Sequence, residues 1–188
     1  MKIAVVMGSP RSAGNTATVT GWVEEKLREQ GHEVDRINAV DLKITGCTGC
    51  NACKVEAAIP GCVVEGVDEY LAYLIDADAI LIASPLYAWG FSGQLKIMLD
   101  HAYSLAKPSP DGTRSLIAGK RMGFLITAAG PVQNNIELLA ACFPSFAGFL
   151  QCELVPPLLV PGCTKPDELP EGIKPAAERL AIELAGAA

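Results

Sequence analysis

The chain has 188 residues, of which half are hydrophobic and 19% are charged, and its formal net charge is −6. Because a chain of this length buries roughly 70% of its unfolded surface, we predict a single domain over residues 1–188. The negative charge and the lack of a Lys/Arg cluster argue against nucleic acid as a partner, and the short, interrupted apolar runs argue against a membrane protein.

The first sixteen residues predict a strand, a loop and the start of a helix. The apolar run over residues 2–7 is typical of a buried parallel strand, and it is too short for the core of a signal peptide, so we expect a cytoplasmic protein. Apolar residues spaced three and four apart from Val19 onward predict a helix. The loop between them, residues 8–16, directs backbone N–H groups and the positive end of a helix at one spot, which favours an anion such as phosphate.

This loop differs from the well-known nucleotide-binding signatures. Asn15 follows Gly14 where a Walker loop has Lys, and Pro10 stands where the GxGxxG fingerprint has its second glycine. The loop also lacks the GxSxG elbow, so we expect Ser9 to donate hydrogen bonds rather than to act as a nucleophile. What remains is a compact cradle for a monophosphate, as flavin mononucleotide (FMN) requires; an ordinary capped turn between a strand and a helix is the alternative.

A cysteine-rich insertion over about residues 43–66 follows the second predicted strand, residues 33–38. It carries three thiols at CxxCxxC spacing and a fourth after eight more residues: Cys47, Cys50, Cys53 and Cys62. Thiols at this spacing can bind one 4Fe-4S cluster. Zinc, a redox-active dithiol and free thiols are the alternatives. The three other cysteines, Cys142, Cys152 and Cys163, are expected to be structural, and neither His32 nor His101 lies in a ligand or base pattern.

The rest of the chain alternates between helices and strands. Helices are predicted from residue 67, through residues 95–99, over residues 132–149 and over residues 173–184. Strands are predicted over residues 77–83, 121–127 and 153–160, the last interrupted by Pro156-Pro157. Residues 107–119 are predicted as a polar connection. Five strands that alternate with helices predict a parallel α/β sheet covered on both faces. A flavodoxin-like strand order, 2-1-3-4-5, would bring the loops after strands one, three and four together, whereas an order with strand one at an edge would not.

Two groups of motifs together give a specific resemblance. Gly8-Ser9-Pro10-Arg11 with Gly14-Asn15-Thr16, and Ser84-Pro85-x-Tyr87 with Ser92-Gly93-x-Leu95-Lys96 and Asp100, resemble the NADPH-dependent FMN reductase family of the flavodoxin superfamily. The CxxCxxC segment is similar to the iron-sulfur flavoprotein branch of that family, although the fourth cysteine comes sooner there. The resemblance covers about residues 1–130 and implies a flavodoxin-like three-layer sandwich with a five-stranded parallel sheet of order 2-1-3-4-5.

The resemblance also implies which residues bind FMN. Those expected to hold its phosphate are Ser9, Arg11, Ser12, Asn15 and Thr16. Those expected to contact the isoalloxazine are Pro85, Leu86, Tyr87, Ala88 and Trp89 on one side and Thr127, Ala128, Ala129 and Gly130 on another. Tyr87 and Trp89 have an alternative role as core or interface aromatics. No side chain is expected to be catalytic, because the flavin itself carries hydride and electrons.

The expected function is that of an FMN-dependent oxidoreductase of the NAD(P)H-dependent FMN or quinone reductase type. Its electron donor would be NAD(P)H or ferredoxin, and its acceptor a quinone or a flavin. One alternative is an iron-sulfur flavoprotein that carries electrons from ferredoxin through a 4Fe-4S cluster without NAD(P)H activity, and another is a module in which the four cysteines hold zinc. By analogy with the family, we expect a homodimer or homotetramer.

Overall fold

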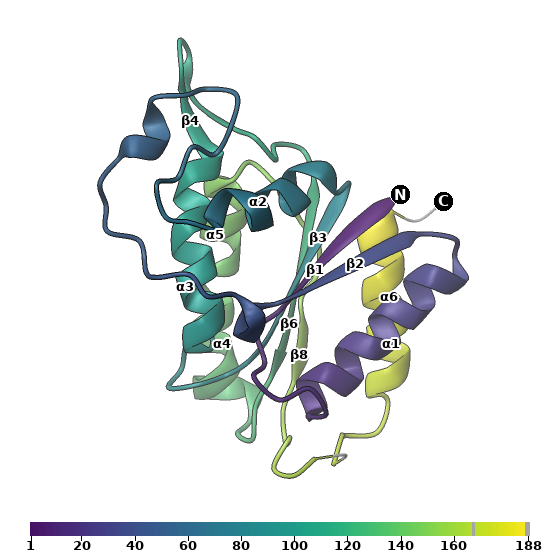
Figure 1. The fold of residues 1–188 in the computed structure, drawn as a ribbon. Coiled ribbons are helices and arrows are strands. Elements are labelled where there is room, and N and C mark those ends of the chain that lie inside the picture. The colour runs from purple at the N-terminus through teal and green to yellow at the C-terminus, as the bar shows by residue number, and fades with distance from the viewer. Residues whose placement is uncertain (167, 187–188) are drawn as a thin grey trace.

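A twisted sheet of six strands crosses the middle of the computed structural model, which describes residues 1–166 and 168–186 (Figure 1). Its strands are β1 (Lys2–Met7), β2 (Glu33–Asn38), β3 (Ala79–Pro85), β6 (Arg121–Thr127), β7 (Glu153–Leu154) and β8 (Leu158–Val160). All the pairs are parallel, in the order β2-β1-β3-β6, with both β7 and β8 on the outer side of β6. The predicted order of a flavodoxin-like fold is therefore confirmed.

The number of strands differs from the prediction of five. The predicted fifth strand is two short strands, because Pro156 and Pro157 have no N–H to donate to a ladder. β7 pairs with the start of β6 and β8 pairs with its end. β3 also begins and ends two residues later than predicted, so that Ser84 and Pro85 belong to the strand rather than to the loop after it.

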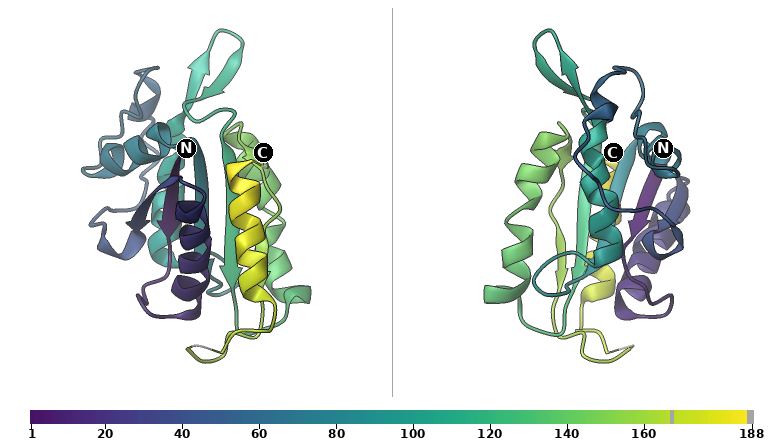
Figure 2. Two further views of the ribbon diagram at one scale, coloured as in Figure 1. Left: turned by 90° about the vertical axis from the view of Figure 1, so that its right-hand side faces the viewer. Right: turned by 60° about the vertical axis from the view of Figure 1, so that its left-hand side comes forward.

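Helices cover both faces of the sheet (Figure 2). On one face lie α1 (Asn15–Glu29) and α6 (Ile173–Ala185), and on the other lie α2 (Val67–Asp76), α3 (Gly93–His101), α4 (Glu137–Ala140) and α5 (Phe143–Phe149). Short turns are η1 (Ala39–Asp41), η2 (Ala52–Lys54), η3 (Ala102–Leu105) and η4 (Val132–Ile136). In the described part of the chain, no helix is long and apolar enough to span a membrane.

The predicted helix over residues 132–149 is wrong in its continuity. Gln133 and Asn134 leave helical geometry inside η4, with Asn134 at a φ of 54°. Pro144, in the first turn of α5, lacks the N–H that would continue a preceding helix, so a new helix begins there. One predicted helix is thus a short irregular turn followed by α4 and α5.

A hairpin replaces part of the predicted connection over residues 107–119. β4 (Ala106–Ser109) and β5 (Gly112–Ser115) pair antiparallel and project beyond the sheet (Figure 2). The residues between them, Pro110 and Asp111, form with Gly112 a Pro-Asp-Gly sequence that is typical of turns. Gly112 has a φ of 122°, which a residue with a side chain rarely adopts.

The core has one layer on each face of the sheet, as the alternation of side chains along a strand requires. In β1, Ile3 and Val5 pack toward α1 and α6, whereas Ala4 and Val6 pack toward α2 and α3. The phenyl rings of Phe124 in β6 and Phe143 in α5 stack with centroids 4.0 Å apart.

Two weak acids on the α2 and α3 side should make the fold sensitive to alkali. Burial raises the pKa of Cys152 to about 11 and also raises the pKa of Tyr70, whose hydroxyl donates to the Met98 carbonyl at 2.6 Å. In the unfolded chain both groups ionise near their ordinary values, so above about pH 9 these two groups bind fewer protons in the unfolded state than in the folded state. Their contribution to the free energy of unfolding therefore falls as the pH rises from about 9 to 11.

We expect the melting temperature to be lower at pH 10.5 than at pH 8.5, as measured by circular dichroism. Cys152→Ala should make this drop smaller, because it removes a thiol whose proton the folded state holds more tightly than the unfolded state. A variant whose melting temperature falls as steeply as that of the wild type would contradict the assignment to Cys152.

Candidate functional site

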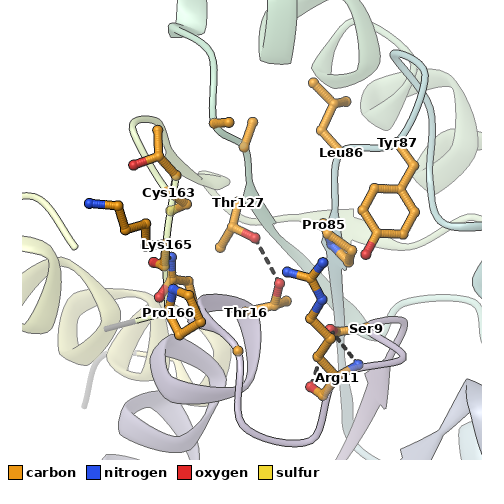
Figure 3. Close-up of a pocket in the computed structure, with 15 residues that line it drawn as sticks. Ser9, Arg11, Thr16, Pro85, Leu86, Tyr87, Thr127, Cys163, Lys165 and Pro166 are labelled. Atoms are coloured by element: carbon orange, nitrogen blue, oxygen red, sulfur yellow. Dashed lines mark hydrogen bonds between the residues drawn. The ribbon is translucent and has the colours of Figure 1, made fainter. Parts of the chain in front are cut away.

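The loops after β1, β3, β6 and β8 meet in one open cleft of about 250 Å³ at the carboxyl edge of the sheet (Figure 3). The residues that line it are Ser9, Arg11, Gly14, Asn15, Thr16, Pro85, Leu86, Tyr87, Thr127, Ala128, Ala129, Cys163, Thr164, Lys165 and Pro166. The sheet order brings these loops together, because the carboxyl ends of parallel strands share an edge.

Most residues predicted to bind FMN line this cleft, and four do not: Ser12, Ala88, Trp89 and Gly130. For those four, contact with a cofactor stays a prediction. The sequence analysis missed the wall formed by residues 163–166. A signal was present, because this segment directly follows the last predicted strand and therefore starts at the same edge of the sheet.

The first loop gives the cleft an anion-binding end. The Ser9 hydroxyl accepts a hydrogen bond from the Arg11 N–H at 3.2 Å and donates to the Arg11 carbonyl at 3.3 Å, which fixes the loop. The guanidinium of Arg11 extends into the cleft (Figure 3). α1 begins at Asn15 with Gly14 as its N-cap, so the positive end of the helix and its first N–H groups face the same space.

A buried serine, Ser92, ties the loop after β3 to the first loop, the one after β1. The Ser92 hydroxyl donates to the Gly8 carbonyl at 2.5 Å and accepts from the Leu95 N–H at 3.3 Å, so it caps α3 while holding the first loop. The Gly8 N–H in turn donates to the Ala83 carbonyl at 2.7 Å. A side chain at Gly8 has no room, since its Cβ would lie 2.8 Å from the Leu95 Cβ and 3.0 Å from the Ala83 oxygen.

Hydrogen bonds also join the other walls of the cleft. The hydroxyls of Thr16 and Thr127 lie 2.7 Å apart, and both residues are buried (Figure 3). The Leu86 N–H donates to the Thr127 carbonyl at 2.8 Å, and the Asn15 side chain donates to the Lys165 carbonyl at 2.8 Å. The cleft is therefore largely preformed rather than assembled by a ligand.

The loop after β3 contains a strained turn. Tyr87 and Gly90 exchange N–H···O bonds of 3.0 and 2.9 Å around Ala88 and Trp89, which have φ values of 46° and 57°. Left-handed backbone at two successive residues with side chains costs roughly 1–2 kcal/mol each. The turn leaves Tyr87 beside the cleft and Trp89 63% exposed to solvent, rather than on the cleft wall.

The four predicted ligand cysteines, Cys47, Cys50, Cys53 and Cys62, line a second and much smaller cavity of about 20 Å³. His101, at the end of α3, lies on the same cavity, where its Nδ1 is 3.6 Å from the Cys62 sulfur and its Nε2 is 2.8 Å from the Thr45 carbonyl oxygen. His101 lies in no ligand or base pattern of the sequence, and 39 residues separate it from Cys62, so its place on this cavity was not predicted.

The thiols on this cavity differ in acidity. The Ala52 N–H and the Thr48 hydroxyl hydrogen-bond to the Cys50 sulfur and lower the pKa of its thiol, whereas burial raises the pKa of the Cys62 thiol. Within residues 1–166 and 168–186, no three His, Cys, Asp or Glu side chains gather closely enough to hold one metal ion. The four cysteines therefore share a cavity without forming a compact group of metal ligands in the described part of the chain.

Comparison with known proteins identifies a family that matches this chain. A family model described as NADPH-dependent FMN reductase matches residues 1–162. An iron-sulfur flavoprotein of Methanocaldococcus jannaschii is 37% identical over 105 residues, which are 56% of this chain and 53% of that protein. An FMN-dependent NADH:quinone oxidoreductase of Burkholderia lata is 38% identical over 88 residues, 43% of this chain and 42% of that protein. The matches thus span about half the length of these curated relatives.

The fold has solved counterparts. A crystal structure of an FMN-dependent NADH-azoreductase of Bacillus anthracis, in complex with FMN, superposes with a TM-score of 0.71 at 18% identity and covers 99% of this chain and all of that one. At this identity the likeness shows the fold alone. Since the family model covers most of the chain and the loops that carry its motifs form one cleft, the chain belongs to the NADPH-dependent FMN reductase family.

Proposed function

We propose that this protein is an FMN-dependent oxidoreductase that takes electrons from NAD(P)H and passes them to a quinone or a free flavin. The observation that carries the proposal is the cleft, where an arginine and the positive end of α1 face three further loops at one sheet edge. FMN, when bound, supplies the hydride and electron chemistry.

The protein's own residues would bind and orient the cofactor. Arg11 and the first turn of α1 would hold the phosphate dianion, with the hydroxyls of Ser12 and Thr16 as further donors. The segments 85–87 and 127–129 would flank the isoalloxazine and exclude water from one face. The open side of the cleft would admit the nicotinamide and then the acceptor.

A second candidate is an iron-sulfur flavoprotein that carries electrons from ferredoxin through a 4Fe-4S cluster. Four cysteines on one cavity favour it, and so does the name of the Methanocaldococcus jannaschii relative. Cys47, Cys50, Cys53 and Cys62 would be the ligands. The cavity of about 20 Å³ holds little more than one water-sized sphere, so the exposed segment around Cys47 and Cys50 would have to move outward to admit a cluster.

Anaerobic purification followed by visible spectroscopy and iron analysis tests both candidates. We expect flavin peaks and, if the cluster is held, a broad shoulder at roughly 400 nm, where thiolate-bound iron absorbs. The reductase is supported if NADPH or NADH is oxidised with a quinone or added FMN as acceptor. If neither nicotinamide is oxidised but reduced ferredoxin rapidly reduces the flavin, the electron carrier is the better description; a colourless protein that binds no added FMN contradicts both.

Replacing Arg11 by glutamine should weaken FMN binding about 10-fold to 100-fold, because a hydrogen bond to a charged group contributes about 1.5–3 kcal/mol. Quenching of flavin fluorescence gives the dissociation constant. Riboflavin, which lacks the phosphate, should bind the variant and the wild type equally. Lys96→Gln is the matched control, since Lys96 pairs with Asp100 on the surface of α3 and does not line the cleft. An Arg11 variant that loses FMN and riboflavin affinity equally would contradict a role in phosphate binding.

We further propose one flavodoxin-like domain over residues 1–188 with the cysteine-rich insertion at about residues 43–66, a homodimer or homotetramer, and a cytoplasmic location. Both hydrophobic layers pack on the same sheet, which supports one domain. Exposed aromatics such as Trp89 and Phe149 are compatible with a subunit contact. Light scattering that gives the mass of one chain, 19.7 kDa, would contradict the assembly.

A further inference from the structure

The segment between the third and fourth cysteines is irregular and needs something to hold it. Eight residues separate Cys53 from Cys62, and residues 55–59 are all exposed. Bringing the ends of such a flexible segment together costs conformational entropy. Nevertheless both cysteines line the same cavity.

A buried lysine from outside the insertion spans this gap. Lys107, in β4, is only 2% exposed, and its ammonium donates to the Cys53 carbonyl at 2.5 Å and to the Pro60 carbonyl at 2.7 Å. Lysine is almost never fully buried unless its charge has partners. Here the partners are the two ends of the segment, so one ammonium closes the loop.

The backbone at Gly61 and Cys62 is held by a second side chain, from α2. The carboxylate of Asp68, in the first turn of α2, accepts from the Gly61 N–H and from the Cys62 N–H, each at 2.9 Å. Lys107 on the Pro60 carbonyl and Asp68 on the next two N–H groups therefore fix the backbone just before the Cys62 side chain.

A second lysine, Lys54, extends from the insertion to the segment that leads into β4. Lys54, in the turn η2 of the insertion, donates to the carbonyls of Tyr103 and Ala106, each at 2.5 Å, and its ammonium lies 3.4 Å from the centroid of the Tyr103 ring. The insertion and the base of the β4–β5 hairpin thus hold each other, and Figure 1 shows the turn η2 beside β4.

We propose that Lys107 is a positioning residue for the cysteine site: by joining the carbonyls of Cys53 and Pro60 it keeps Cys62 on the cavity that the other three cysteines line. The functional role of Lys107 rests on the proposed cysteine-bound cluster. Its effect on the position of Cys62 can be tested without a cluster.

The test compares Lys107→Met, Lys107→Arg and the control Lys96→Met by hydrogen exchange over residues 53–62 and by the rate of iodoacetamide alkylation at Cys62, both in protein without iron. Loss of two hydrogen bonds from an ammonium should speed exchange and Cys62 alkylation in Lys107→Met about 10-fold to 100-fold. Lys107→Arg, which keeps the donors, should restore most of the protection, and Lys96→Met should behave as the wild type. If Lys107→Met does not fold, Lys107→Gln takes its place.

Equal rates in Lys107→Met and the wild type, or no protection by arginine, would overturn the inference. After reconstitution with iron and sulfide, the release of iron to a chelator should follow the same order of variants. A wild type that holds no iron but shows the expected exchange pattern would contradict the cluster and leave the positioning role supported. If the wild type holds iron and the Lys107 variants match it in every measurement, the cluster would be supported and the positioning role of Lys107 contradicted.

Discussion

Replacing Gly8 by valine should abolish FMN binding and lower the free energy of unfolding by about 3 kcal/mol, the upper part of the range for overpacking a filled site. Even a Cβ at this position would lie 2.8 Å from the Leu95 Cβ and 3.0 Å from the Ala83 carbonyl oxygen. Neither neighbour is a flexible chain end, so the first loop has to move away from α3. That movement breaks the bond from Ser92 to the Gly8 carbonyl and displaces Arg11 from the cleft. Urea unfolding and flavin titration measure the two effects.

Gly21→Ala is the matched control for this prediction. Gly21 lies inside α1, and an added Cβ there would meet nothing within 4 Å. Alanine at an open position in a helix should raise the free energy of unfolding by about 0.5–1 kcal/mol and leave FMN binding unchanged. If Gly8→Val bound FMN as well as Gly21→Ala does, the first loop would not form the phosphate end of the cleft.

The strands and the first loop could be predicted because their signals are local. β2 and β6 have the predicted bounds, since alternation or a buried apolar run marks each strand and parallel strands require crossover helices. The meeting of three loops followed from the sheet order. For the same reason the wall at residues 163–166 could have been predicted, because it follows the last predicted strand of the same sheet.

The remaining features depend on contacts between distant segments. The position of His101 beside Cys62 and the burial of Lys107 follow from how the insertion packs on α3 and β4, which no spacing encodes. The exposure of Trp89 depends on a turn with left-handed backbone at Ala88 and Trp89, a conformation that their side chains disfavour. The Ser84-Pro85-x-Tyr87 motif therefore predicted the position of the loop after β3, whereas the direction of the Trp89 side chain could not be predicted from it.

The two sites lie at opposite ends of α3. Ser92, just before its first residue, holds the cleft loop, and His101, its last residue, lies on the cysteine cavity. Nine residues of helix span about 13 Å. A change at the cysteines should therefore leave the cleft intact, so substitutions can test FMN binding and the proposed cluster separately.

If the proposed 4Fe-4S cluster is bound, replacing Cys50 by serine should remove its absorption almost completely and leave the FMN content unchanged. Serine keeps the size of the side chain but loses the thiolate that iron binds. Hydrogen bonds from the Ala52 N–H and the Thr48 hydroxyl also lower the pKa of the Cys50 thiol, which favours its thiolate form. Iron and sulfide analysis after anaerobic reconstitution, with flavin measured on the same sample, gives both quantities.

Cys142→Ser is the matched control, because Cys142 is also exposed but does not line the cavity. It should retain iron and flavin in the wild-type ratio. If both serine variants lost iron equally, the metal would be bound without regard to the cavity, and the four cysteines would not be its ligands. If the Cys50 variant lost flavin together with iron, the two ends of α3 would be coupled in a way that its length and contacts do not predict.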